Sequence, residues 1–171
     1  MIEIRAGRSE GRAGESIGQT RRNRAPSPED GKLSPMNDAA RDLVQSLGLQ
    51  PHPEGGFYRE TFRSTAEVPA HGGTRRAVTS ILFLLPTGAR SRLHRVKSDE
   101  IWLHQRGDEV RLTIGEKEVR LGQGGAATLQ AVVPPGVWQA AECLPGEAGY
   151  ALVGCVVAPG FEFDDFELSD D

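Results

Sequence analysis

The chain of 171 residues has few apolar residues, 37% in all, and no long hydrophobic run. Its longest uninterrupted apolar segment, residues 81–85, is as long as one strand and far below the ~18 residues that cross a bilayer. The N-terminus also lacks the apolar stretch of a secretory signal. We therefore expect a cytoplasmic protein that does not insert into membranes.

The chain also has few cysteines and no excess of positive charge. Cys143 and Cys155 are too few for a disulfide framework and form no zinc-binding pattern, so we expect buried, inert thiols. The net charge is −4, and residues 1–36 carry seven Lys/Arg against five Asp/Glu, which leaves −6 on the remainder. A body this acidic is a poor ligand for a phosphate backbone, and we expect no nucleic-acid partner.

Glycine and proline are abundant, with 21 and 11 residues, and they separate short apolar segments. The predicted strands are residues 57–62, 77–85, 99–105, 109–114, 118–121, 131–133, 139–142 and 150–157. Helices do not alternate with these strands, which excludes a Rossmann-like parallel sheet. The pattern predicts an all-β fold, an antiparallel sandwich or barrel.

Three parts of the chain differ in composition. Residues 1–36 contain no aromatic residue and predict a disordered extension, although the sequence leaves open whether Met36 is the true start. Residues 37–168 form the predicted domain, which begins with a short helix over 39–47, capped by Asn37 or Asp38 and ended by Gly48. Residues 169–171 end a segment from 162 that carries six acids and no base, which we interpret as a solvated tail whose first part is held by Phe161, Phe163 and Phe166.

The strand over residues 99–105 carries the most informative pattern. Side chains alternate between the faces of a strand, so Glu100, Trp102 and His104 share one face. A carboxylate, an indole and an imidazole in a row are costly in an apolar core unless each polar group has a partner. The row therefore favours either solvent or a ligand cavity.

These residues resemble the cupin superfamily. Its first signature is a glycine, five residues, a His-x-His pair, three or four residues, a glutamate, six residues and a glycine. Gly88, His94, Glu100 and Gly107 match every spacing, while Val96 replaces the second histidine. The second signature, Pro-x-Gly-x-x-His, corresponds to residues 134–139, with Gln139 in the place of the histidine.

Four further blocks resemble the cupin-5 family of this superfamily, a domain of unknown function (number 985). They are residues 49–64, 98–102, 132–140 and 157–163. The resemblance implies a double-stranded β-helix, the cupin jelly roll, and a homodimer. It does not imply a settled reaction, because one fold hosts many functions.

A cupin metal site would correspond here to His94, Val96, Glu100 and Gln139. Octahedral sites generally need at least three strong nitrogen or oxygen donors, and this set keeps two plus a weak amide. We therefore expect no metal cofactor. The alternative is a metal-dependent, dioxygenase-like cupin in which His94, Glu100 and Gln139 bind a divalent metal, with His104 as a further ligand.

The metal-free interpretation makes His94 an acid or base and Glu100 its partner. This arrangement resembles the metal-independent sugar-nucleotide epimerases of the cupin superfamily. We therefore expect a small organic ligand in the barrel and an epimerase- or isomerase-like activity. The alternatives are a hydrogen-bonded pair that only fills the barrel mouth, and a non-catalytic binding module.

Other side chains are candidates for the wall of this cavity. Trp102, Trp138 and Gln139 lie at signature positions. His104 lies on the same face of the predicted strand as Trp102. Tyr58 and Arg59 follow a Gly-Gly loop and point in opposite directions, but the sequence does not fix which of the two points inward. His52 and His71 lie outside the signatures, and we expect them in loops or at the surface.

Overall fold

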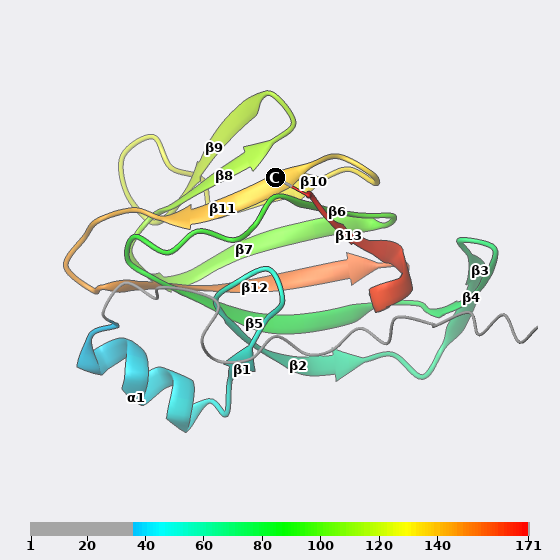
Figure 1. Cartoon of the computed structure of the whole chain (residues 1–171), viewed down its shortest axis with the longest axis horizontal. Helices are drawn as coiled ribbons and strands as arrows, with labels where there is room; N and C mark the ends of the chain where they lie inside the picture. The colour runs from blue at the N-terminus through cyan, green and yellow to red at the C-terminus, as the bar shows by residue number, and fades with distance from the viewer. Residues whose placement is uncertain (1–35, 171) are drawn as a thin grey trace, which may run out of the picture.

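The computed structural model describes residues 36–170, and its strands form two antiparallel sheets that face each other (Figure 1). The six-stranded sheet contains, in spatial order, β1 (Gln50–Pro51), β2 (Phe57–Arg63), β5 (Thr79–Pro86), β12 (Tyr150–Ala158), β7 (Asp99–Gly107) and β10 (Gln130–Val133). The five-stranded sheet contains β13 (Phe166–Leu168), β6 (His94–Val96), β11 (Gln139–Cys143), β8 (Val110–Ile114) and β9 (Lys117–Leu121). A separate hairpin pairs β3 (Glu67–Ala70) with β4 (Gly73–Arg76).

Strands that are distant in the sequence lie side by side in both sheets. Strand β12 lies between β5 and β7, so Val153 is paired with Phe83 on one side and with His104 on the other. In the second sheet, β11 lies between β6 and β8. This topology confirms the predicted all-β fold, a double-stranded β-helix.

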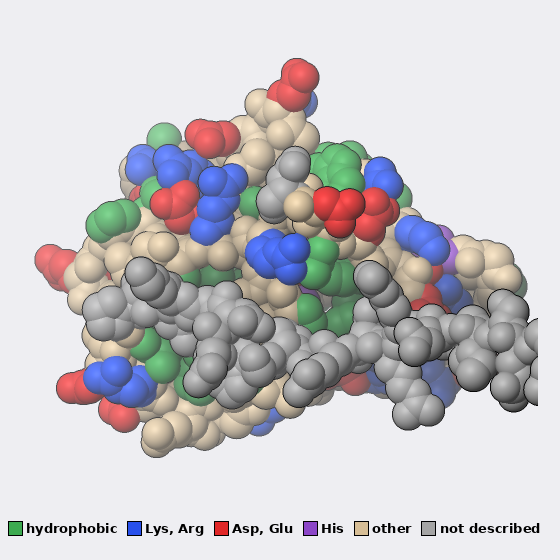
Figure 2. All heavy atoms as spheres, in the orientation of Figure 1, with side chains coloured by type: hydrophobic (Ala, Val, Ile, Leu, Met, Phe, Trp, Pro, Cys, Tyr) green, Lys and Arg blue, Asp and Glu red, His purple; other side chains and the backbone are tan. Residues whose placement is uncertain are grey.

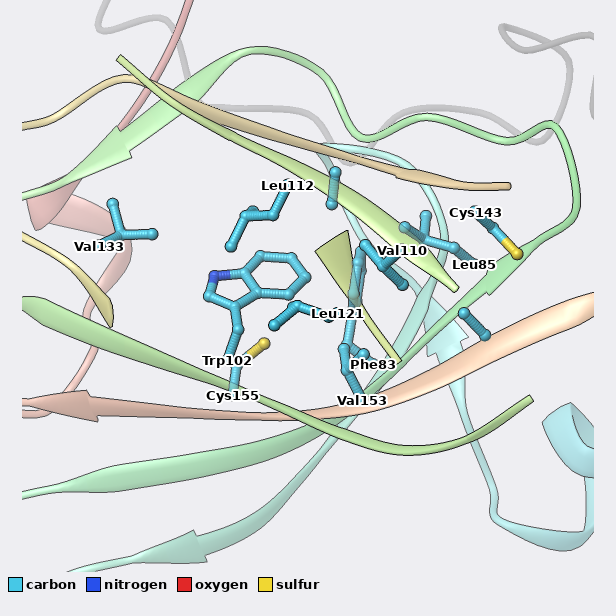
Figure 3. Close-up of a cluster of buried hydrophobic side chains, with 12 residues drawn as sticks. Phe83, Leu85, Trp102, Val110, Leu112, Leu121, Val133, Cys143, Val153 and Cys155 are labelled. Atoms are coloured by element: carbon cyan, nitrogen blue, oxygen red, sulfur yellow. The ribbon is translucent and has the colours of Figure 1, made fainter. Parts of the chain in front are cut away.

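The space between the sheets holds a hydrophobic core centred on Trp102 (Figure 3). The Trp102 ring is 1% exposed and meets Phe83 edge-to-face, with the ring centroids 5.9 Å apart. Leu112 and Leu121 cover it from the five-stranded sheet. Both cysteines are free and buried, as expected, with Cys155 beside Trp102 in this cluster.

The short helix α1 (Asp38–Ser46) covers the outer face of the six-stranded sheet. The Asn37 side chain accepts a hydrogen bond from the Ala40 amide at 2.8 Å, which is the predicted N-cap. The helix packs on Leu84 and Leu152, whereas Phe83 on the same sheet faces the inner core. Burial on both faces explains why residues 81–85 form an uninterrupted apolar run.

The first part of the C-terminal acidic segment is folded, whereas we predicted a solvated tail that only its aromatic side chains hold to the domain. Residues Phe163–Asp165 form a 3-10 helix, η1, and β13 then pairs with β6. Asp165 is 3% exposed, and its carboxylate accepts hydrogen bonds from Arg75 and Lys97. The acidic segment is therefore part of the domain, because basic partners from other elements neutralise its buried charge.

The surface seen in Figure 2 carries interspersed acidic and basic side chains. Among the helices that the structure describes, none is long and apolar enough to span a membrane. The predicted disordered extension lies outside the described residues, apart from Met36, which packs near α1.

Candidate functional site

A cavity of about 250 Å³ opens between the two sheets at the end of the core near Glu100. Its wall comes from β2, β5, β6, β7 and β12, from the loop before β2 and from the segment around η1. Tyr58, Ile81 and Val157 make much of this wall apolar, while His94 and Glu100 add polar groups. The structure thus brings His94 and Glu100 to one enclosed space.

The loop between β1 and β2 delivers two further titratable side chains, His52 and Glu54. The Gly55 amide donates to the His52 carbonyl at 2.9 Å, and the His52 amide donates to the Gly56 carbonyl at 3.1 Å, which closes a tight turn. Gly56 has a φ of +69°, and a Cβ there would lie 2.8 Å from the Leu84 carbonyl oxygen. The two glycines therefore permit the turn that places Glu54 inside.

A direct backbone contact joins this loop to the segment that carries His94. The Arg92 amide donates to the Glu54 carbonyl oxygen at 2.6 Å. The Glu54 side chain, 8% exposed, then has its Oε2 atom 3.3 Å from His94 Nε2 and 3.4 Å from His52 Nδ1. Glu54 therefore lies between two imidazoles.

The hydrogen bonds of the two imidazoles assign the proton in this cluster. His94 Nδ1 lies 2.8 Å from the Arg92 carbonyl oxygen, which can only accept, so Nδ1 carries the proton and Nε2 is an acceptor. His52 Nδ1 accepts from the Glu54 amide at 3.3 Å, so it too carries no proton to donate to the Glu54 carboxylate. Two acceptor nitrogens facing one carboxyl oxygen favour the protonated form of Glu54.

Burial favours the same protonation states. It raises the pKa of Glu54 well above its ordinary value, and the neighbouring Glu100 charge raises it further. It lowers the pKa of His94 to about 4, although the hydrogen bond to Arg92 acts in the opposite direction. It also lowers the pKa of His52 to about 4, with a second contribution from His94. The two imidazoles are therefore neutral near neutral pH, and burial shifts Glu54 toward its protonated form.

Glu100 has a different environment on the other side of the cavity. The Gln139 Nε2 amide donates to Glu100 Oε2 at 2.6 Å, and the Trp102 Nε1 group donates to Gln139 Oε1 at 2.9 Å. Burial raises the pKa of Glu100 to about 7, while hydrogen bonds from Gln139 and Cys155 oppose that rise. Glu100 therefore changes its charge close to neutral pH.

An aromatic cluster lines the mouth of the cavity. Tyr58 meets His52 edge-to-face with ring centroids 4.6 Å apart, and Phe163 stacks on the other side of His52 at 6.3 Å. Phe161 and Phe166 contact Phe163 edge-to-face. This arrangement presents flat apolar surfaces to a ligand.

An irregularity in β2 brings a charged residue to the same mouth. The register between β2 and β5 shifts between Glu60 and Phe62, which leaves Phe62 54% exposed and sets Arg63 on the cavity rim. Arg63 donates to Glu60 at 2.8 Å and to Glu162 at 2.6 Å. The rim therefore carries two carboxylates around one guanidinium.

The other predicted site residues lie at different depths. Tyr58 lines the cavity and Arg59 is exposed on the opposite face of β2. Trp102 and Gln139 are each 1% exposed and lie in the core rather than on the cavity wall, where Gln139 connects Glu100 to Trp102. The Arg95 guanidinium lies over the Trp138 ring, with its Cζ atom 4.6 Å from the ring centroid.

His104 faces inward, as the alternation of side chains along the strand predicts, but its contacts lie away from the cavity. Its Nε2 atom lies 3.0 Å from the Asp108 carbonyl oxygen. Its Nδ1 atom is the one buried side-chain nitrogen or oxygen without a hydrogen-bond partner among residues 36–170. The alternation along β7 therefore predicts orientation and does not predict which side chains reach the cavity.

Sequence reasoning missed His52 and Glu54. The expectation that His52 is a loop or surface residue is half right, because the residue lies in a loop but its side chain is 7% exposed. The available signal was the segment Pro51-His52-Pro53-Glu54, which lies inside one of the four family-like blocks. His71, the other residue set aside, contacts Ser98 Oγ at 2.8 Å outside this cavity.

The donors around the cavity do not fit a cupin metal centre. Within the described part of the chain, no group of three or more His, Cys, Asp or Glu side chains is arranged to hold a metal ion. Val96 supplies no donor atom, and the Oε1 atom of Gln139 already accepts the Trp102 indole hydrogen bond. The side chains that line the cavity do bring acid and base groups of their own.

The arrangement combines titratable groups in one cavity with a largely apolar wall. Glu54, which burial shifts toward its protonated form, has its Oε2 atom 3.3 Å from His94 Nε2. Glu100 faces the same cavity and becomes a carboxylate near neutral pH. Two carboxyl groups whose pKa values are separated by their surroundings are typical of proton-transfer sites.

Comparisons with known proteins agree with this architecture. The family model described as "Cupin superfamily (DUF985)" matches residues 41–169. An uncharacterized protein of Saccharomyces cerevisiae is 34% identical over 146 residues, which cover 73% of this chain and 72% of the yeast protein. A crystal structure from Shewanella oneidensis is 37% identical with a TM-score of 0.69, covering 76% of this chain and 84% of that one. A hypothetical protein from Leishmania major is 35% identical with the same TM-score, covering 76% and 86%. The chain therefore belongs to the cupin-5 family of the cupin superfamily.

Proposed function

We propose that this cupin-5 protein binds a small organic molecule in the cavity between its sheets and moves a proton on it, as an isomerase or epimerase does. The observation that carries the proposal is the convergence of Glu54, His94 and Glu100, from three separate elements, on one enclosed space. A purely structural polar cluster does not require an open cavity beside it.

In this proposal, the two carboxyl groups have opposite roles. Glu100, with a pKa of about 7, acts as the base that removes a proton from carbon next to a carbonyl group. Glu54, held protonated between His52 and His94, donates a proton to the carbonyl oxygen or to the opposite face of the carbon. His94 Nε2 accepts the hydrogen bond of the Glu54 carboxyl group and keeps it in position, because the Nδ1 proton of His94 is donated to the Arg92 carbonyl. After turnover, Glu100 releases to water the proton that it removed, and Glu54 takes up a proton from water.

The sugar-nucleotide version of this reaction has less support than the proton transfer itself. A diphosphate needs an available cation, and the arginine on the rim is already engaged by Glu60 and Glu162. We therefore assign the cavity to a small carbonyl compound without a nucleotide, and keep sugar nucleotides in the panel that tests it.

Hydrogen exchange at carbon tests the proposal without knowledge of the product. The protein is incubated in D₂O with aldoses, ketoses, amino ketones and sugar nucleotides, and proton NMR follows the loss of individual C–H signals. We expect exchange on a member of the panel, with a rate that rises through about pH 7 as Glu100 ionises.

Two variants and a control complete this test. Glu54→Gln and His94→Asn should each lower the exchange rate by about 100-fold, the usual contribution of general acid–base catalysis. Glu67→Gln, on β3 and paired with Arg76, is the matched control and should exchange like wild type. Exchange that is unchanged in His94→Asn contradicts the proposed role of His94. Tight binding without exchange on any member assigns the cavity to a binding module instead.

A further inference from the structure

The charges around the cavity carry information about its ligand. Four carboxyl groups, Glu54, Glu60, Glu100 and Glu162, line it among the described residues. Arg63 is the lone arginine or lysine in that lining, and both of its ion pairs go to members of the same set. Since His52 and His94 are neutral at neutral pH, the cavity has a surplus of negative charge.

The rim groups form one ion-paired cluster. Glu60 and Glu162 have side chains 38% and 44% exposed, and each is hydrogen-bonded to the guanidinium of Arg63. Two carboxylates and one guanidinium leave one negative charge at the mouth. A carboxylate or phosphate ligand would meet this charge before it reached Glu54 and Glu100.

The walls next to these acids are aromatic. Phe161 and Phe163 flank Glu162 in the sequence, and Tyr58 lies two residues before Glu60 on the same face of β2. The Phe161 and Phe163 rings lie 5.1 Å apart, edge-to-face. Aromatic faces beside a site of net negative charge attract organic cations through the ring quadrupole and the net charge together.

We infer that the cavity takes a small organic cation, an amine or quaternary ammonium group on a short apolar body, in preference to an anion. This inference names the ligand class of the site in the proposed function and rests on that proposal for the site alone. The cation lies beside the Glu60 and Glu162 carboxylates and against the aromatic rings. Its apolar body extends toward Ile81 and Val157.

Three probes of similar size and different charge test the inference. They are benzyltrimethylammonium, benzyl alcohol and benzoate, and isothermal titration calorimetry measures their dissociation constants on the full chain at pH 7.5. We expect the cation to bind about tenfold more tightly than the alcohol, and benzoate to bind more weakly than both. The affinity of the cation alone should fall as salt is added, because salt screens the rim charges.

Charge-neutral variants sharpen the same test. Glu60→Gln combined with Glu162→Gln frees Arg63 and should weaken cation binding by about tenfold while benzoate binding improves. Glu67→Gln again serves as the control outside the cavity and should leave all three affinities unchanged. Thermal melting shows whether each variant is folded.

The outcomes separate this inference from the proposed function. Benzoate that binds as tightly as the cation, or a cavity that takes none of the three probes, overturns the inference. Cation binding without any carbon–hydrogen exchange supports the inference and contradicts the proton-transfer function. Exchange on an anionic compound supports the proton-transfer function and overturns the cation preference.

Discussion

Strand β7 passes through two environments that differ sharply over a few residues. Glu100 opens into the cavity, whereas Trp102, on the same face, is sealed in the hydrophobic core. Gln139 joins them, because one end of its amide bonds Glu100 and the other bonds Trp102. The comparison shows that one barrel can have a packed end that supplies stability and an open end whose buried carboxyl groups have raised pKa values.

The largest expected effect lies at the packed end. Trp102→Ala leaves a cavity beside Phe83 and an unpaired Gln139 Oε1, so it should lower the free energy of unfolding by about 4 kcal/mol. Phe163 lies at the mouth of the open end and is 53% exposed, so Phe163→Ala should lower the free energy of unfolding by about 0.5 kcal/mol or less. Urea denaturation measures both, and equal losses at the two positions would remove the distinction between the ends.

The protonation state of the open end should appear in the pH dependence of stability. The pKa of Glu100 is about 7 when folded and 4.5 when unfolded, so the folded chain retains a proton that the unfolded chain releases between these values. The stability that this group contributes is full below the unfolded pKa and is lost as the pH rises through the folded one. Glu100→Gln removes this loss, so its stability relative to wild type should rise by about 3 kcal/mol from pH 4 to pH 8.

Denaturation of wild type and Glu100→Gln in parallel at each pH measures that difference. Titration of buried groups that do not interact with Glu100 affects both proteins and cancels to first order. A stability difference that stays constant from pH 4 to pH 8 would mean that Glu100 titrates normally, like an exposed carboxylate.

A smaller effect concerns the turn that delivers Glu54. Gly56→Ala places a Cβ 2.8 Å from the Leu84 carbonyl oxygen at a φ of +69° and should cost about 2 kcal/mol. Gly72→Ala is the matched control, because its φ is +76° but its Cβ would meet nothing within 4 Å. That control should cost about 1 kcal/mol, since it pays only for the backbone conformation. Chemical denaturation compares the two, and an equal cost would show that the close approach to Leu84 is relieved.

Much of the fold could be predicted because its longer elements have strong local signals. The run at residues 81–85 marks β5, and Asn37 and Gly48 mark the ends of α1. The strands β6 and β13 have three residues each, which is too short for any periodicity to appear. Their pairing depends on long-range contacts such as those of Asp165 with Arg75 and Lys97.

The sequence predicts which side chains of β7 point inward, but it does not predict which residues form the candidate site. Alternation along β7 correctly turns Glu100, Trp102 and His104 inward, yet packing between the sheets decides how deep each lies. Arg63 reaches the rim only because β2 shifts its register after Glu60. Glu54 contacts His94 across 40 positions of sequence, through a loop whose course the sequence pattern does not specify.

The account depends above all on two carboxyl groups that share one cavity with displaced pKa values. Carbon-13 NMR of the chain with glutamate labelled at the carboxyl carbon measures this directly across a pH titration. We predict one resonance that titrates near pH 7 and disappears in Glu100→Gln, and a second that titrates well above the ordinary glutamate range and disappears in Glu54→Gln. Glutamate resonances that all titrate below about pH 5 would contradict the account.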